Sequence, residues 1–261
     1  MVSTLKLVER QLAMVDIRRR LEERVPQPGR YITYEGIAFG PCLLISRECG
    51  SGGSLMAQLA GDRLGWNVFD ATIVDEIARS AHVHQRLVQS VDEHVHSNWE
   101  QTLRDLFSDD LSDEGYLRHL QEVLMTLGHH GNVVIVGRGA KYLLPSQCAV
   151  RVRLVAPLET RAKRVAERQK LPMEVAKSKV REIDKERAAF ARKVFQKDIG
   201  SALYHDLIIN TSKFDEGQAS DLVLDAVKQK LGVDSLPKTM AASPLSQKIN
   251  SSPGAPVDRA I

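Results

Sequence analysis

A glycine-rich turn near the start of the chain has the residue types that hold phosphate. After an apolar run that begins at Leu43, the turn contains Gly50, Gly52 and Gly53, and the hydroxyl of Ser54 opens a predicted helix. Glycines let backbone N–H groups approach phosphate oxygens, and the first turn of a helix adds unpaired donors and a favourable dipole. The segment is therefore predicted to bind a phosphorylated ligand.

This turn departs from the common phosphate-loop pattern G-x-x-x-x-G-K-[ST]. Aligned on Ser54, the chain has Gly52 at the second glycine, but Arg47 at the first glycine and Gly53 at the lysine. The missing lysine is the main departure from a catalytic interpretation, because phosphoryl transfer needs cations around the transferring group. Arg47, or an arginine from later in the chain, could supply that cation, since electrostatic stabilisation depends on where the charge lies.

Polar residues also follow three further apolar runs. Arg138 lies between Gly137 and Gly139, directly after the run VVIV. A guanidinium there suits bidentate recognition of phosphate or carboxylate, although the segment could also be a tight turn whose arginine pairs with a surface carboxylate. Asp70 ends another run, and residues 210–212 follow the last one. In a parallel α/β sheet, such segments converge on one crevice beyond the carboxyl ends of the strands.

A second basic region occupies residues 161–193. Arg161, Arg164 and Arg168 recur at helical spacing on one face, and further lysines and arginines alternate with glutamates and aspartates. Mixed charge of this kind is typical of a solvated helical face. The functional alternative is a mobile, arginine-bearing lid that closes over transferring phosphates and excludes water.

The elements that must position these residues alternate between strand and helix. This alternation predicts an α/β fold with a parallel sheet flanked by helices on both faces. Predicted strands are 38–46, 66–69, 133–136, 150–155 and 207–210. Predicted helices are 54–64, with Leu55, Leu59 and Leu64 inward, then 72–81, 117–129, 158–170, 173–197 and 216–231.

Composition and the two ends of the chain complete the prediction. A net charge of +3 gives no reason to expect nucleic acid as the main ligand. Three scattered cysteines and no apolar run of membrane-spanning length favour a cytoplasmic protein without a membrane span. Residues 3–25 predict an amphipathic helix that packs on the body or on a second subunit, and a homodimer through it is open. We expect an N-terminal extension at 1–35, a core domain at 36–232 and a disordered tail at 233–261.

Five blocks of the sequence, in unbroken order over roughly residues 40–230, resemble the cytidylate kinase-like proteins. That family is a branch of the P-loop nucleoside monophosphate kinases. The blocks begin with ISRECGSGGSLMAQLAGDRLGWNVFDATIVDEIA and VVIVGRGAKYLLP, and end with VRVRLVAPLETRAKRVAERQ, DKERAAFARKVF and DLIINTS. The resemblance implies a P-loop fold of the monophosphate-kinase type, with a helical acceptor-side insert and a lid.

The resemblance also implies roles for individual residues. The family's glycine loop binds the phosphates of ATP, and those positions are Gly50, Ser51, Gly52, Gly53 and Ser54. Ser54 matches the hydroxyl that helps to hold Mg²⁺, and Asp70 matches an acidic position near the acceptor nucleotide. Arg138 matches the arginine of a G-R-D segment that grips the monophosphate, but Gly139 replaces the aspartate. The positions that resemble the lid and post-lid residues around the phosphates and donor nucleotide are Arg161, Arg164, Asp184 and Arg187.

Three function classes remain open from the sequence alone. The first is a kinase that moves the γ-phosphoryl group of ATP to a nucleoside monophosphate, most simply cytidylate, with Mg²⁺ on the phosphates. Its candidate catalytic residues are Arg47, Arg138, Arg161, Arg164 and Arg187. The second is a non-catalytic nucleotide sensor of the same fold that acts through a protein partner, and a scaffold without nucleotide completes the alternatives.

Overall fold

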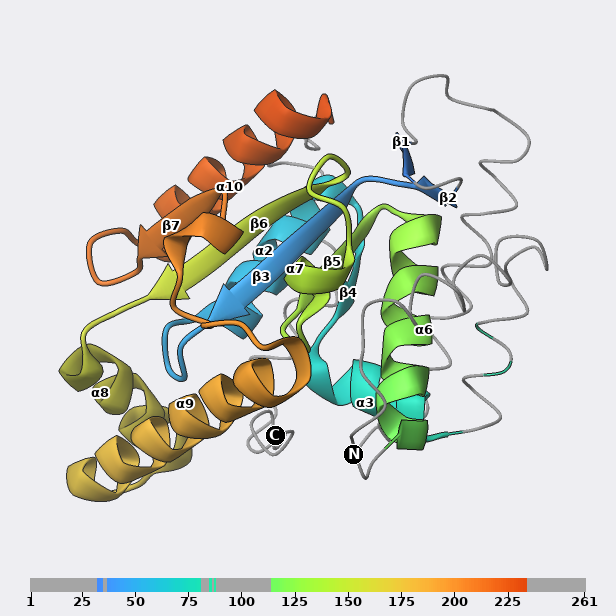
Figure 1. The fold of residues 1–261 in the computed structure, drawn as a ribbon. Helices are drawn as coiled ribbons and strands as arrows, with labels where there is room; N and C mark the ends of the chain where they lie inside the picture. Colours follow the sequence, from blue (N-terminus) through green and yellow to red (C-terminus); the bar gives the residue numbers. More distant parts are fainter. Residues whose placement is uncertain (1–31, 35–36, 81–84, 86, 88–113, 234–261) are drawn as a thin grey trace.

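The fold is built around a five-stranded parallel sheet (Figure 1). The computed structural model describes residues 32–34, 37–80, 85, 87 and 114–233. The predicted N-terminal helix, the tail from residue 234 and most of the stretch 82–116 lie outside these residues. The strand order is β4-β5-β3-β6-β7. The strands are β3 (Cys42–Arg47), β4 (Asn67–Phe69), β5 (Val133–Val136), β6 (Ala149–Val155) and β7 (Leu207–Asn210).

The central strand β3 is buried on both faces, as a parallel sheet covered by helices requires. Leu43 and Ile45 face one hydrophobic cluster, whereas Cys42 and Leu44 face the other. The register pairs Cys42 with Val133 of β5 and with Ala149 of β6, so the carboxyl ends of the three strands lie at one edge.

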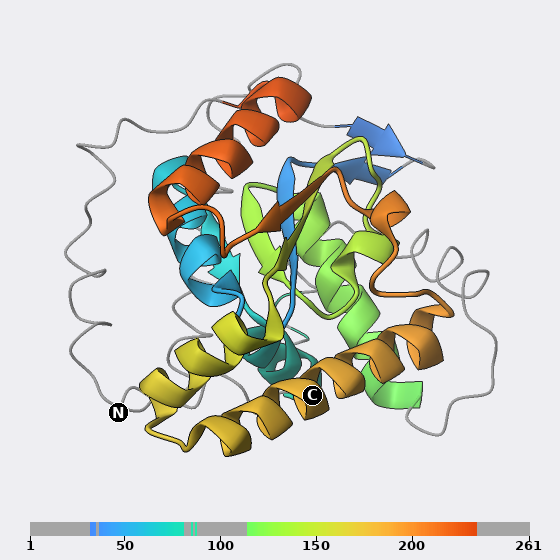
Figure 2. The same cartoon turned by 90° about the vertical axis from the view of Figure 1, so that its left-hand side faces the viewer.

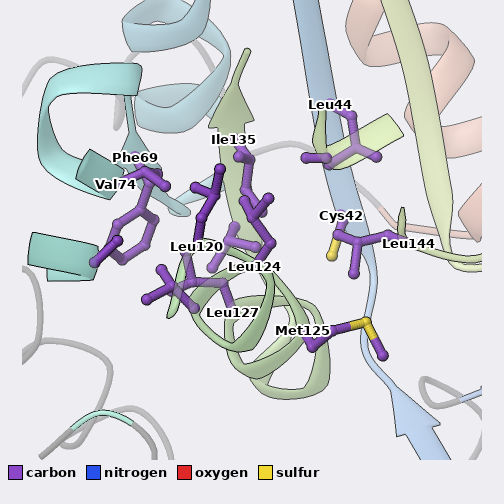
Figure 3. Close-up of a cluster of buried hydrophobic side chains, with 14 of the residues drawn as sticks. Cys42, Leu44, Phe69, Val74, Leu120, Leu124, Met125, Leu127, Ile135 and Leu144 are labelled. Carbon is purple, nitrogen blue, oxygen red and sulfur yellow. The ribbon is translucent and has the colours of Figure 1, made fainter. Parts of the chain in front are cut away.

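Helices cover both faces of the sheet (Figure 2). On one face, α2 (Gly53–Leu64) and α10 (Glu216–Leu231) pack over the inward side chains of β3, β5 and β6. On the other face lie α3 (Ala71–Arg79), α6 (Glu114–His130) and the short α7 (Ala140–Leu143). Figure 3 shows Leu120, Leu124 and Leu127 of α6 grouped with Phe69 of β4 and Ile135 of β5. The predicted α/β class and two-sided helix layers are confirmed.

A helical hairpin lies beyond the carboxyl ends of β3 and β6, made by α8 (Leu158–Gln169) and α9 (Met173–Phe195) (Figure 1). The two helices pack around a small core of their own. That core contains Ala162 and Val165 from α8, Ala176 and Val180 from α9, and Cys49 from the glycine-rich turn. Because Cys49 belongs to this core, the hairpin and the turn are packed together.

Two details of the sequence prediction are wrong. The strand predicted at 38–46 is two strands, because β2 (Ile37–Phe39) pairs antiparallel with β1 (Ile32–Tyr34) and β3 begins only after Gly40 and Pro41. Leu55 was expected to face inward but is 47% exposed. The buried face of α2 instead consists of Gly53, Met56, Ala57, Ala60, Gly61 and Leu64.

The described part of the chain contains no helix long and apolar enough to cross a membrane.

Candidate active site

The glycine-rich turn joins β3 to α2 and has the geometry of an anion-binding loop. Gly50 and Gly52 have φ values of 79° and 85°, which are strained for residues with a side chain. Within α2 the N–H of Met56 bonds to the carbonyl of Gly52, and no side chain caps this helix. The three preceding N–H groups, from Gly53 to Leu55, therefore have no carbonyl of an earlier helical turn to bond. A Cβ added at Gly52 would meet nothing within 4 Å, so this side of the loop is open to a ligand.

The underside of the loop is held by the end of the last strand. Ser51 is fully buried, its hydroxyl donates to the carbonyl of Glu48 at 2.9 Å, and its own carbonyl accepts from Thr211 Oγ1 at 2.9 Å. Arg164 of α8 donates to Thr211 Oγ1 at 3.0 Å and to the Thr211 carbonyl at 2.8 Å. Arg164, predicted to touch phosphates, thus lies in a chain of hydrogen bonds that supports the loop.

Arg161 and Asp184 form the base of the same loop. Arg161 is 8% exposed, and its Nε donates to the carbonyl of Ala156 at 2.8 Å and lies 3.2 Å from Glu48 Oε2. Its Nη1 donates to the carbonyl of Cys49 at 3.1 Å and to Asp184 Oδ2 at 2.6 Å. Asp184 Oδ1 accepts the N–H of Cys49 at 2.7 Å. In this arrangement both predicted site residues bind the loop backbone itself.

Arg138 lies in a buried polar cluster after β5. It pairs with Asp75 of α3, which also accepts a hydrogen bond from the hydroxyl of Tyr116 at 2.7 Å. Its guanidinium lies 5.5 Å from the centre of the Phe190 ring. Burial raises the pKa of Asp75, while the Arg138 charge and the Tyr116 hydroxyl oppose that rise. Arg138 Nε is buried without a hydrogen-bond partner among the described residues, so one donor of the guanidinium is not used within them.

A pocket adjoins this cluster and the end of β3 that leads into the loop. It lies at the carboxyl ends of β3 and β5, and α9 covers it. The charged and aromatic residues that line it are Arg47, Arg138, Lys141, Tyr142, Arg187 and Phe190. Three arginine side chains around one pocket favour an anionic ligand.

The remaining predicted residues lie around this region. Arg187 Nη1 of α9 approaches the carbonyl of Arg47 at 3.4 Å, and both side chains line the pocket. Ser54 is exposed in the first turn of α2. Asp70 caps α3, since its Oδ1 accepts the N–H of Ile73 at 2.9 Å. That carboxylate therefore already has a local structural role.

The absent aspartate at Gly139 has a steric explanation. Gly139 has φ 72°, and a Cβ added there would lie 2.0 Å from Cε2 of Phe195. Phe195 ends α9 and packs in the larger hydrophobic cluster, with Tyr142 5.0 Å away between ring centres. A side chain at position 139 therefore cannot coexist with this placement of the Phe195 ring.

Sequence reasoning missed Asp75, Glu48 and Lys141. Asp75 could have been found, because it is four residues after Ala71 and three before Ala78 and so lies on the apolar face of α3. An acid on such a face needs a buried partner, and Arg138 is that partner. Glu48 and Lys141 carry no comparable signal in the sequence.

Lys141 is the least expected of these groups. It is 6% exposed, and its Nζ lies 2.7 Å from His205 Nε2 and 3.3 Å from the carbonyl of Ile199. Burial, together with the nearby Arg153 and Arg151 charges, lowers the pKa of Lys141 to about 7. Lys141 therefore connects the pocket to the segment between α9 and β7.

A parallel α/β sheet with a glycine-rich turn between its central strand and the next helix is the architecture of P-loop kinases. The sequence profile of the cytidylate kinase-like family matches residues 43–213. The chain belongs to the cytidylate kinase-like family.

Individual relatives agree with this assignment at modest identity. The chain is 29% identical to the cytidylate kinase of Methanocaldococcus jannaschii over 104 residues, which are 39% of this chain and 58% of that protein. It is 37% identical to the cytidylate kinase of Pyrococcus horikoshii over 84 residues, which are 32% of this chain and 43% of that protein. The matched region thus spans about half the length of these relatives.

A solved structure supports the fold alone. An uncharacterized protein from Eubacterium ventriosum aligns with a TM-score of 0.60 at 19% identity, covering 72% of this chain and 98% of that one.

Proposed function

We propose that this protein is an ATP-dependent phosphotransferase that moves the γ-phosphoryl group to a nucleoside monophosphate. One observation carries the proposal: an anion-binding loop follows β3, and a buried arginine with an unused donor follows the adjacent strand β5, across one cationic pocket. The Gly137 N–H donates to the Ile45 carbonyl at 3.0 Å, so the two segments are direct neighbours. Donor and acceptor phosphates bound there would lie side by side.

The chemistry asks the protein mainly for positioning and positive charge. A phosphate oxygen of the acceptor forms a bond to the γ-phosphorus, the bond from that phosphorus to the bridging oxygen breaks, and ADP leaves with the electron pair. Arg138 would orient the acceptor phosphate, and the backbone N–H groups from Gly53 to Leu55 would hold the donor phosphates. Arg187 would add charge from α9, whereas Arg161, Arg164 and Asp184 would keep the loop in shape.

Magnesium fits this arrangement. When bound, Mg²⁺ would neutralise phosphate charge, and the exposed hydroxyl of Ser54 suits a ligand of such an ion. No group of three or more acidic, histidine or cysteine side chains that could hold a metal occurs among the described residues.

Cytidylate is the acceptor we propose first, because the matched relatives carry the name cytidylate kinase. Gly139 weakens the case that cytosine is the preferred base, because the G-R-D segment of the cytidylate kinases has an aspartate at this position. Asp70 would approach an acceptor nucleotide only if it released the N–H of Ile73. Other monophosphates therefore belong in the same test.

A non-catalytic nucleotide sensor is the second candidate. The Arg138–Asp75 pair favours it, because an acceptor phosphate must compete with a carboxylate that already binds the guanidinium. Gly53 at the lysine position favours it as well. A sensor would bind ATP at the same loop and act through a protein partner.

ADP release separates the two candidates. Each common nucleoside monophosphate is offered with ATP and Mg²⁺ to the wild type, Arg138→Ala, Ser54→Ala and a matched control, Lys163→Ala, whose side chain is 73% exposed on α8. We expect turnover that requires a monophosphate. One lost charge-assisted contact of about 1.5–3 kcal/mol predicts a KM for the acceptor raised roughly tenfold to a hundredfold in Arg138→Ala. ATP binding without acceptor-dependent ADP release would instead support the sensor.

Compartment and oligomeric state stay predictions. Cys42, Cys49 and Cys148 are buried and none takes part in a disulfide, which suits a reducing compartment such as the cytoplasm. The homodimer predicted through the N-terminal helix depends on residues outside the described part of the chain.

A further inference from the structure

The side chain of Arg47 runs in a slot between two glycines. Its stem passes Gly53, where an added Cβ would lie 2.7 Å from Arg47 Cγ and 2.9 Å from Arg47 Cβ. Its head lies against Gly137, where an added Cβ would be 2.4 Å from Nη1 and 3.4 Å from Cζ. Contacts under 3.0 Å do not fit, so a side chain at either position would displace this arginine.

Gly53 is the position at which the phosphate-loop pattern has its lysine. The glycine at this position lacks the expected cation, but it also leaves room for the aliphatic stem of Arg47, which is itself a cation. Gly53 is a helical residue whose φ is not in the left-handed region, so backbone conformation does not demand glycine at this point. Close approach of the Arg47 stem is the physical reason that the structure offers.

The head of Arg47 lies between the two phosphate sites of the proposed reaction. Gly137 directly precedes Arg138, and its N–H continues the pairing of β5 with β3 through the Ile45 carbonyl. Arg47 itself ends β3 immediately before the loop. A guanidinium against Gly137 therefore has the donor loop on one side and the acceptor arginine on the other, and it lines the pocket between them.

We propose that Arg47 is a catalytic residue that replaces the missing lysine by neutralising charge on the γ-phosphoryl group as it passes from donor to acceptor. This inference rests on the proposed function. Arg47 neither gives nor takes a proton, since its guanidinium stays charged throughout. The bonds made and broken are those already described, and the arginine lowers the barrier electrostatically.

The position of the Arg47 side chain between the two glycines determines which variants test the proposal. Arg47→Ala removes the cation, and Gly53→Lys combined with Arg47→Ala places a cation at the usual lysine position with the stem cleared away. Gly53→Lys alone keeps the crowding. Lys163→Ala serves as the control, because that side chain is 73% exposed on α8 and its partner Glu167 is exposed as well. Circular dichroism and thermal melting establish that each variant is folded.

We expect Arg47→Ala to lose roughly a hundredfold to a thousandfold in kcat with little change in the KM for the acceptor monophosphate, as for loss of one preorganised donor to the transition state. The double variant should regain at least tenfold over Arg47→Ala, whereas Gly53→Lys alone should be impaired and Lys163→Ala unchanged. Wild-type kcat in a folded Arg47→Ala protein, or no regain in a folded double variant, would overturn the assignment.

A binding measurement keeps the test independent of turnover. Calorimetry with ATP and with ADP, both with Mg²⁺, measures whether Arg47 contacts the γ-phosphate. Arg47→Ala should lose ATP affinity at least tenfold more than ADP affinity. If the wild type binds both nucleotides but turns over no acceptor, the proposed function fails while this ratio still decides the contact. An unchanged ratio, or a wild type that binds neither nucleotide, overturns the role of Arg47.

Discussion

Removing the guanidinium of Arg161 tests whether the base of the glycine loop depends on it. The side chain has four acceptors, at distances between 2.6 and 3.2 Å, in the segment that precedes α8, on α9 and in the loop. Arg161→Ala leaves Glu48 and Asp184 without their shared cation. A Cβ at Gly50 would lie only 2.6 Å from the Arg161 carbonyl, so the helix and loop backbones are also in direct contact there.

The expected loss in the free energy of unfolding of Arg161→Ala follows from the burial of the ion pairs that this arginine makes. Breaking a buried ion pair from one side costs about 3–5 kcal/mol. The carboxylates of Glu48 and Asp184 are 25% and 27% exposed, so water compensates part of the loss and the low end, about 3 kcal/mol, is expected. For a domain of this size each kcal/mol lowers Tm by about 2–4 °C, which gives a decrease of about 6–12 °C.

Urea unfolding and thermal melting of Arg161→Ala measure this loss, and Lys163→Ala on the same helix is the control, expected within about 0.5 kcal/mol of the wild type. A double-mutant cycle with Asp184→Asn should show a coupling energy of about 1–3 kcal/mol. A loss below about 1 kcal/mol, or no coupling, would refute the view that Arg161 holds the loop.

Three further outcomes are expected. Gly139→Ala should lose about 1–3 kcal/mol of stability, because its Cβ would overlap the Phe195 ring, and urea unfolding measures the change. Asp75→Asn should lose about 3 kcal/mol, because it leaves the buried Arg138 charge without its carboxylate, yet inorganic phosphate should raise its Tm more than that of the wild type. Lys141→Met should weaken the pH dependence of stability. The folded pKa of about 7 lies below the ordinary 10.5, so the unfolded chain binds more protons between these values and wild-type stability rises with pH across this window, measured as urea unfolding at pH 6 and pH 9.

Each expectation can fail on its own. Gly139→Ala as stable as the wild type would mean that Phe195 moves aside without cost. Equal responses of the wild type and Asp75→Asn to phosphate would mean that Asp75 does not compete for Arg138. An unchanged difference in stability between pH 6 and pH 9 in Lys141→Met would assign that dependence to other groups.

The sequence predicts the fold well because the apolar runs are long enough to identify. The run VVIV can only be a buried strand in a chain that alternates strand and helix, and β5 is that strand. The errors arise at residues whose burial depends on tertiary contacts that the sequence pattern does not show. Leu55 follows helical spacing but is exposed, and the small residues Ala57, Ala60 and Gly61 belong to the face that packs.

The candidate site is less predictable, because charge patterns do not reveal partners. Residues 161–193 are consistent both with a solvated face and with a lid, yet Arg161 and Arg164 are held against the loop by backbone and side-chain acceptors. Those acceptors come from segments far away in sequence. The slot of Arg47 depends on two glycines 84 residues apart, at 53 and 137, whose joint role emerges only in three dimensions.

The small core of the helical hairpin has a consequence for modular engineering. Because Cys49 is one of its members, exchanging α8 and α9 for the equivalent helices of another protein would leave the loop packed against foreign side chains. The unit that can be exchanged is larger than the hairpin and includes the turn from Glu48 to Ser51. Chimeras that respect this boundary should keep nucleotide affinity, whereas those cut at Pro157 and Gln196 should lose it.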